Sequence, residues 1–175
     1  MIYFDHSSTT SVRPEVSNVY SQLLAQQYGN PDSLHALGRK AHALLEKSRE
    51  NIAKMLHVLP GEILFTGCAS ESNSLAIIGY ALANRNRGNH ILVSNVEHPS
   101  VMHSMEWLKQ FGFEIEYLPI NSNGIITPSL VKERIRKDTI LVSTMHVNNE
   151  MGAINPVKEI SEVVHSIPTC VYHVD

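Results

Sequence analysis

The chain has 175 residues, of which 43% are hydrophobic and 18% are charged, and its formal net charge is −3. This composition is typical of an ordinary globular protein, and the length is sufficient for one medium domain with its own hydrophobic core. The balance of charge gives no basic surface for nucleic acid, and no apolar run approaches the ~20 residues of a membrane span. The first residues lack a basic segment followed by an apolar one, so no signal peptide is expected. Two cysteines cannot form a disulfide framework, and we expect a soluble, cytosolic protein.

The first 60 residues predict helices. The stretch from Pro14 to Tyr28 has a helical pattern, and a break follows at Gly29-Asn30-Pro31. From Ser33 to His57 the apolar residues recur on one helical face, which predicts a long helix.

From Glu62 onward, strand and helix patterns alternate. Strands are predicted for five short segments rich in β-branched or aromatic residues: 62–66, 90–94, 113–118, 139–143 and 170–174. Helices are predicted for the stretches between them: 72–84, 100–111, 128–137 and 156–166, the last with Pro156 in its first turn. A tight turn at 121–124 is expected to place Gly124 at positive φ. The repeated units predict an α/β fold, with a mostly parallel sheet and helices on both faces.

A possible phosphate site begins at Phe65, where a predicted strand runs into small residues and then a helix. Such a helix start offers unpaired N–H groups and a partial positive charge, and the Ser70 hydroxyl is a further donor. The alternative is that Ser70 or Ser72 simply caps the helix, and the stretch taken alone favours that interpretation.

Three polar segments follow later predicted strands, where open α/β sheets bind their ligands. His98 follows the strand at 90–94, and a histidine there can stack on a flat cofactor and exchange protons near neutral pH. Asn148-Asn149-Glu150 follows the strand at 139–143, and Asp175 follows the last predicted strand. Each has an ordinary alternative: a solvated loop histidine, a surface turn and a capping aspartate. Taken together and in order, they predict one ligand site.

Six ordered motifs make the chain closely similar to the cysteine desulfurases, which are fold type I pyridoxal-phosphate (PLP) enzymes of the class V aminotransferase group. These motifs lie at residues 3–10, 29–38, 62–73, 97–99, 145–152 and 173–175. Two departures fall in the phosphate turn, where Gly67-Cys68 replaces the usual Ser-Gly and Ser70 replaces the common Thr. A cysteine in place of glycine raises the question of whether the turn is crowded or needs a different φ.

The resemblance implies a role for five residues. Ser70 and the backbone at Ala69 would bind the cofactor phosphate. His98 would stack on the pyridine ring and help to move protons. Asn149 would hydrogen-bond the ring hydroxyl, and Asp175 would pair with the pyridinium nitrogen, keeping the ring electron-poor. No metal-binding residue is assigned.

The resemblance also implies that this chain is the N-terminal part of a longer enzyme. Residues 1–15 are expected to contribute to a second domain or to a dimer partner, and residues 16–175 to form an incomplete PLP-binding large domain. In the family, a cofactor-contacting Gln, the lysine that holds PLP, an arginine for the substrate carboxylate and the sulfur-accepting cysteine lie beyond the position of Asp175. We therefore expect the chain to be cut after a core strand and to be inactive alone. Neither Cys68 nor Cys170 matches the catalytic cysteine, and Cys170 is expected to be a small buried hydrophobe.

The activity implied for the parent enzyme is removal of sulfur from L-cysteine, leaving L-alanine and an enzyme persulfide. Its partners would be a second copy in a homodimer and a sulfur-acceptor or iron–sulfur scaffold protein, with no need for nucleic acid or membrane. Three alternatives remain: a selenocysteine lyase or another class V aminotransferase-like enzyme, a catalytically dead interaction module, and a complete enzyme supplied as two polypeptides.

Overall fold

The computed structural model describes residues 2–175, and the chain divides into two compact units that meet in sequence between Phe65 and Thr66. The predicted division into residues 1–15 and 16–175 concerns the domains of the longer enzyme, and it stays a prediction. Residue 1, which belongs to the first of these segments, lies outside the described residues.

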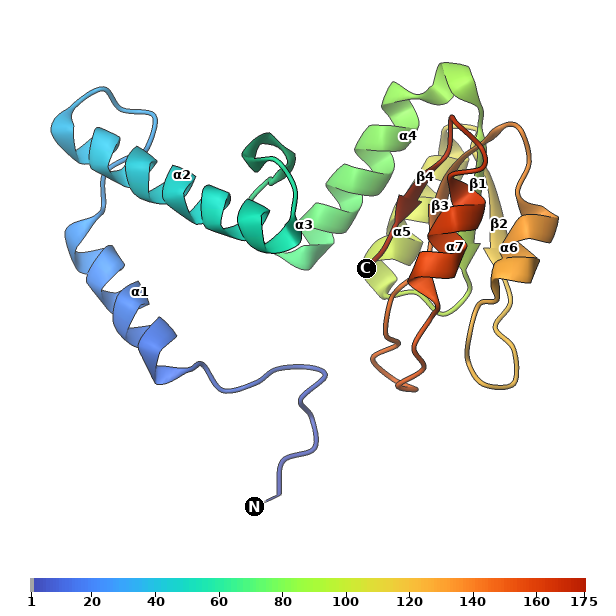
Figure 1. Cartoon of the computed structure of the whole chain (residues 1–175), viewed down its shortest axis with the longest axis horizontal. Helices are drawn as coiled ribbons and strands as arrows, with labels where there is room; N and C mark the ends of the chain where they lie inside the picture. Colours follow the sequence, from blue (N-terminus) through green and yellow to red (C-terminus); the bar gives the residue numbers. More distant parts are fainter. Residues whose placement is uncertain (1) are drawn as a thin grey trace. The chain divides into compact units, whose positions relative to one another are not determined.

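The first unit is helical (Figure 1). It contains α1 (Pro14–Gln26), α2 (Ala36–Leu56) and the short 3₁₀ helix η1 (Pro60–Glu62). Pro14 occupies the first turn of α1, where its missing N–H leaves no hydrogen bond unmade. The His35 ring caps α2 by accepting from the Gly38 N–H, and α2 ends at His57 in the left-handed conformation, with φ 57°. Both predicted helices are confirmed, each with slightly narrower bounds.

The second unit is built on a four-stranded parallel sheet in the order β2-β1-β3-β4. The strands are β1 (His90–Ser94), β2 (Glu114–Leu118), β3 (Thr139–Ser143) and β4 (Val171–His173). Every residue of the two central strands, β1 and β3, is buried, as expected where helices cover both faces of a parallel sheet. The predicted α/β class is confirmed.

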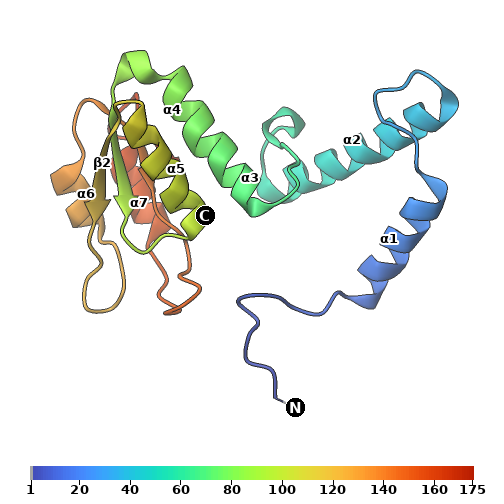
Figure 2. The ribbon, with the colours of Figure 1, turned by 180° about the vertical axis from the view of Figure 1, so that it is seen from behind.

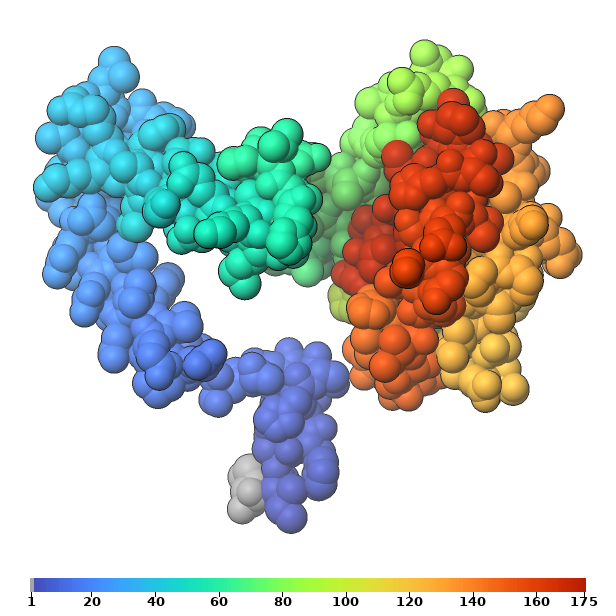
Figure 3. All heavy atoms as spheres, in the orientation of Figure 1, coloured from blue at the N-terminus to red at the C-terminus, as the bar shows by residue number. Residues whose placement is uncertain are grey.

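Helices cover both faces of this sheet, as the opposed views in Figures 1 and 2 show. They are α3 (Ala69–Ser74), the π-helical turn η2 (Leu75–Gly79), α4 (Tyr80–Ala83), the 3₁₀ turn η3 (Arg85–Arg87), α5 (Pro99–Gln110), α6 (Pro128–Arg134) and α7 (Val157–Val164). Because side chains alternate along a strand, Ile91 and Val93 pack with one hydrophobic cluster that includes residues of α5. Leu92 packs with the other cluster, which includes residues of α6 and α7. In Figure 3 the spheres of α7 lie over the sheet on the viewed face.

The structure departs from the predicted elements in three places. The predicted strand at 62–66 is wrong: Glu62 ends η1, and the following residues pair with no strand among residues 2–175. The helix predicted to begin at Ser72 begins at Ala69 and passes through the π turn. Pro156 is the N-cap of α7, with φ −77° and ψ 70°, and lies just before the first turn. The predicted turn is confirmed, with Gly124 at φ 77° and its N–H bonded to the Asn121 carbonyl.

No helix in residues 2–175 is both long enough and apolar enough to cross a bilayer.

Candidate functional site

The predicted site residues of the second unit follow the carboxyl ends of its parallel strands or start its first helix. Since all four strands run the same way, their carboxyl ends lie along one edge of the sheet. The segments after β3 and β4 are hydrogen-bonded to each other. The Thr144 N–H donates to the His173 carbonyl at 3.1 Å, and the His146 N–H donates to the Asp175 carbonyl at 3.0 Å.

The start of α3 is open to an anion. No side chain caps it, so the alternative in which Ser70 or Ser72 caps the helix is wrong. The Ser72 hydroxyl instead pairs with Thr66 Oγ1 at 2.6 Å, and Ser70 is exposed with no side-chain hydrogen bond to any described residue. The first N–H groups of a helix have no partner inside it, so Ala69 and Ser70 present donors at its positive end.

Cys68 fits the turn before α3 without strain. Its φ is −165° and its ψ is 167°, an extended conformation that any residue adopts. The turn is held from the other side, because the Gly67 N–H donates to Glu71 Oε2 at 2.7 Å. Replacement of the family's glycine by cysteine therefore requires no special backbone conformation.

His98 lies between β1 and α5 and caps α5. Its Nδ1 accepts from the Ser100 N–H at 3.2 Å and lies 2.8 Å from the Ser100 hydroxyl. The side chain is exposed, so the ring is oriented through Nδ1 while Nε2 makes no hydrogen bond to any described residue.

Asn149 and Asp175 are also exposed, and neither side chain is hydrogen-bonded within residues 2–175. The neighbouring Asn148 is different, because it is buried and its Oδ1 accepts from the N–H groups of Glu150 and Met151 at 2.9 and 2.8 Å. One asparagine of the pair shapes the turn, and the other leaves its amide free for a ligand.

A buried glutamate at this edge was given no role by the sequence analysis. Glu97 is 8% exposed; its Oε1 accepts from the Met145 N–H at 2.7 Å, while its buried Oε2 has no partner among the described residues. Burial, with a contribution from the negative charge of Asp175, raises the pKa of Glu97 to about 7. Its place inside the predicted motif at 97–99 was the available signal, but the sequence pattern gave no sign of its burial.

Asn155 is a second polar residue that the sequence analysis missed. It is buried, its Nδ2 donates to the Met145 carbonyl at 2.8 Å, and its Oδ1 accepts from the Ile126 N–H at 2.8 Å. It therefore ties the segment that carries Asn149 to the rest of the second unit.

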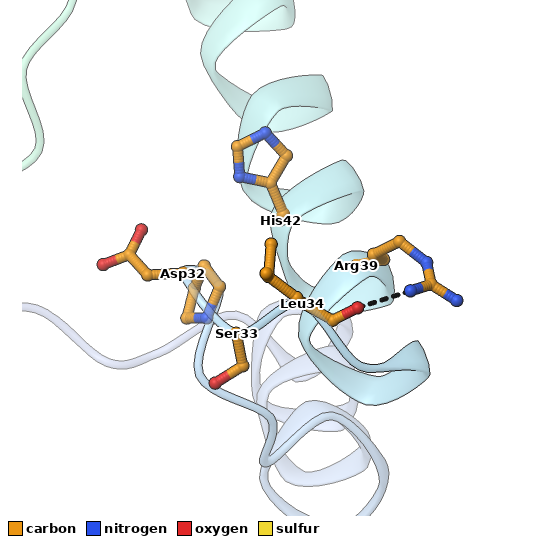
Figure 4. A pocket seen from close by; sticks show the side chains of 6 residues that line it. Asp32, Ser33, Leu34, Arg39 and His42 are labelled. Carbon is orange, nitrogen blue, oxygen red and sulfur yellow. Dashed lines mark hydrogen bonds between the residues drawn. The ribbon is translucent and has the colours of Figure 1, made fainter.

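The motif at 29–38, which includes Asn30 and His35, has a local structural explanation. Asn30 Oδ1 accepts from the Asp32 N–H at 3.0 Å, and His35 caps α2. A Cβ on Gly38 would lie 2.1 Å from the Ser33 carbonyl oxygen, so only glycine fits there. Figure 4 shows the side chains that line a pocket beside this segment, where Arg39 donates a hydrogen bond to the Leu34 carbonyl. The residues that line it are Pro31, Asp32, Ser33, Leu34, Arg39 and His42.

The open groups fit PLP in kind. The uncapped start of α3 suits a phosphate. The exposed His98 offers a ring face, and the unpartnered Asn149 amide and Asp175 carboxylate suit a ring hydroxyl and a ring nitrogen. No cluster of metal-binding side chains occurs among residues 2–175.

The two cysteines differ in burial. Cys170 is buried, which raises the pKa of its thiol to about 12 and confirms the expected buried hydrophobe. Cys68 is exposed.

Known proteins resemble the chain over its whole length. It is 47% identical over 175 residues to the "NifS/IcsS protein homolog" of Lactobacillus delbrueckii subsp. bulgaricus, covering 100% of this chain and 46% of that protein. It is 42% identical over 175 residues to "Cysteine desulfurase IscS 1" of Archaeoglobus fulgidus, covering 100% of this chain and 45% of that protein. Among solved structures, "SspA in complex with cysteine" superposes with a TM-score of 0.92 at 35% identity, over 99% of this chain and 50% of that one.

The chain thus spans about half the length of the relatives that it matches. The aminotransferase class-V family matches residues 2–175. With its parallel sheet, its helices on both faces and this match, the chain belongs to the aminotransferase class-V family.

Proposed function

We propose that this chain is the N-terminal part of a PLP-dependent cysteine desulfurase, which takes sulfur from L-cysteine and leaves L-alanine. The observation that carries the proposal is similarity along the whole chain to a relative named as a cysteine desulfurase. The similar structure named "SspA in complex with cysteine" supports the same substrate. The open polar groups at the carboxyl edge of the sheet supply the kind of site that this chemistry needs.

Five residues would hold the cofactor. The backbone at Ala69 and the hydroxyl of Ser70 would bind its phosphate at the start of α3. His98 would contact the ring, Asn149 would donate to the ring hydroxyl, and Asp175 would pair with the ring nitrogen. The absence of competing hydrogen bonds at Ser70, Asn149 and Asp175 within the described residues supports these roles.

PLP, when bound, supplies an electron sink for the carbanion formed from an amino acid. The Asp175 carboxylate would keep a proton on the ring nitrogen, because a nearby negative charge favours the protonated form. His98 would hold or move a proton near the substrate, since an imidazole has one nitrogen that donates and one that accepts.

The rest of the reaction belongs to residues outside this chain. In the full-length protein we expect a lysine that holds PLP, an arginine for the substrate carboxylate and a cysteine that takes the sulfur. The full-length protein would work in the cytoplasm as a homodimer, and it would pass sulfur to an acceptor such as an iron–sulfur scaffold protein.

The test is an assay of the purified full-length protein. Visible absorption would reveal bound PLP, and amino-acid analysis would measure alanine formed from L-cysteine. The same assay with L-selenocysteine separates a desulfurase from a selenocysteine lyase. A protein that binds PLP but forms alanine only from selenocysteine would replace the proposal with that alternative, and one that binds no PLP would refute it.

A further inference from the structure

A series of five hydrogen-bonded polar side chains runs from the interior of the sheet to His98. They come from β3, β4, α3 and the start of α5, and in order they are Ser143, His173, Asn73, Ser100 and His98. The four distances between consecutive partners are 2.9, 3.2, 3.0 and 2.8 Å. Asn73 is buried and His173 is half-buried, so solvent competes little for the hydrogen bonds in the middle of this series.

The direction of the hydrogen bonds follows from Asn73. Its Nδ2 donates to the Ser100 hydroxyl oxygen, so its Oδ1 is left to accept from His173 Nε2. His173 then carries its proton on Nε2, and its Nδ1 accepts from the Ser143 hydroxyl. Burial lowers the pKa of His173, which favours this neutral form.

The contacts of Ser100 and His98, at the other end of this series of hydrogen bonds, agree with this donor direction. His98 Nδ1 already accepts from the Ser100 N–H, so it has no proton of its own to donate. The Ser100 hydroxyl accepts from Asn73 and turns its hydrogen toward His98 Nδ1. A neutral His98 with an accepting Nδ1 carries its proton on Nε2, the exposed nitrogen.

We propose that Asn73, Ser100 and His173 are positioning residues that hold His98 in one orientation as the Nε2–H tautomer. This inference rests on the proposed function, because it deepens the role of His98 at the cofactor. The exposed Nε2 at the edge of the ring then presents a proton donor, whereas in the other tautomer it would present an acceptor. Asn73 is the central member, because its amide accepts from His173 and donates to Ser100.

The decisive variant is Asn73→Asp, which keeps the shape of the side chain and removes its donor. The new carboxylate accepts from both neighbours, so the Ser100 hydroxyl turns its hydrogen away from His98. The Ser100 oxygen can then accept from an Nδ1–H, but the Ser100 backbone N–H still donates to Nδ1, so neither tautomer of His98 is favoured as strongly as before.

The measurement is nitrogen-15 NMR of full-length protein labelled in its histidine rings, with His98→Gln identifying the His98 signals. We expect a pyrrole-type Nε2 signal and a pyridine-type Nδ1 signal in the unmodified protein, and both signals displaced toward intermediate values in Asn73→Asp. The neighbouring Ser74→Ala variant is the control, because the Ser74 hydroxyl pairs with Ser104 and is not one of the five hydrogen-bonded residues that lead to His98. Alanine formation should fall by about tenfold or more in Asn73→Asp, on the scale found when partners of a functional histidine are removed, and should be unchanged in Ser74→Ala.

Ser100→Ala provides an independent variant if Asn73→Asp fails to fold. It removes the side-chain donor to His98 and leaves only the backbone N–H, so both His98 signals should move toward intermediate values. If the His98 signals of a folded Asn73→Asp or Ser100→Ala protein equal those of the unmodified protein, the inference is overturned. If the signals change but the rate of alanine formation does not fall, the orientation of His98 by these residues plays no part in catalysis. A failure of the proposed function is distinguishable: the tautomer would still respond to the variants, while the unmodified protein would bind no PLP or form no alanine.

Discussion

The two ends of the strands in the second unit differ in whether they leave polar side chains without a partner. At the amino-terminal end of β1 and β3, His90 is fully buried and bonded through both ring nitrogens. Its Nδ1 lies 2.8 Å from Thr139 Oγ1 and its Nε2 lies 3.3 Å from Glu116 Oε2. At the carboxyl ends, Asn149 and Asp175 have side chains without hydrogen bonds to any described residue.

The difference separates polar groups that stabilise the fold from polar groups available to a ligand. Buried groups that are fully hydrogen-bonded add stability and specify one packing arrangement. Groups that are exposed and unpaired at the carboxyl edge contribute little to folding, and their side chains are free to bind. Glu97 lies between these cases, because it is buried and one of its oxygens is bonded while the other has no partner in the described chain.

The largest expected effect is the loss of activity when the exposed side chains at the carboxyl edge of the sheet are truncated. In the full-length protein, His98→Ala or Asp175→Ala should reduce alanine formation from L-cysteine by at least about a hundredfold, the scale of a lost proton-transfer group. The free energy of unfolding should change little in Asp175→Ala, because that side chain is exposed, and should fall by about 0.5–2 kcal/mol in His98→Ala, which removes the N-cap of α5. Steady-state alanine assays and urea unfolding measure the two quantities.

His103→Ala is the matched control for these variants. His103 is an exposed histidine of the same helix, α5, and its variant should keep normal activity. Normal turnover in both His98→Ala and Asp175→Ala would contradict the roles assigned to these residues.

The next effect is a pH-dependent loss of stability caused by Glu97. Its pKa is raised from 4.5 to about 7 in the folded protein, so the folded state retains a proton that the unfolded state releases earlier. The stabilisation is complete below about pH 4.5 and is lost as the pH rises through 7, by roughly 3 kcal/mol at most. Glu97→Gln should remove this dependence, because an amide does not titrate and its oxygen can still accept from the Met145 N–H.

Urea unfolding of the full-length protein between pH 5 and pH 8 measures the effect. The control is Glu162→Gln, since Glu162 is an exposed carboxylate of α7. Equal pH slopes for the unmodified protein and Glu97→Gln would show that Glu97 is ionised throughout this range in the folded state.

The sequence predicts the central strands well because their signal is local. Residues 90–94 and 139–143 each hold three consecutive apolar residues, Ile-Leu-Val, between two polar ones, and the structure has β1 and β3 with these same bounds. The segment at 62–66 has a similar composition but forms no strand. A strand requires a neighbour to hydrogen-bond, and composition does not report whether the neighbour is present.

The candidate site was predictable by position but not by environment. The polar segments after the strands point to the carboxyl edge, yet Asn148 and Asn149 are adjacent in sequence and differ in burial. The same limit applies to Asn73 and Ser100, which come from segments distant in sequence and meet only in the folded unit. Motif reading finds the region, and hydrogen-bond geometry identifies which side chains are free.

At the amino-terminal end of the strands, where the polar side chains are hydrogen-bonded, a smaller loss of stability is expected from Thr139→Val. The change nearly preserves shape but removes Oγ1, which accepts from the Arg136 N–H at 2.7 Å and contacts His90. The free energy of unfolding should fall by about 1–3 kcal/mol, the cost of leaving buried polar groups unpaired. PLP affinity and activity should be retained. Thr10→Val, at an exposed position, controls for the added methyl group, and an unchanged urea midpoint in Thr139→Val would contradict the structural role of this end.

The smallest effect is expected at Cys68, directly before the proposed phosphate site. Its extended backbone is open to any residue, and its side chain makes no capping bond to α3. Cys68→Ala should therefore leave the PLP dissociation constant unchanged and alter the free energy of unfolding by no more than about 0.5 kcal/mol. Ser70→Ala, two residues away, removes a proposed phosphate donor and should weaken PLP binding in the same titration. If Cys68→Ala weakens binding as much as Ser70→Ala does, the thiol itself takes part in the phosphate site, and the replacement of the family's glycine is functional.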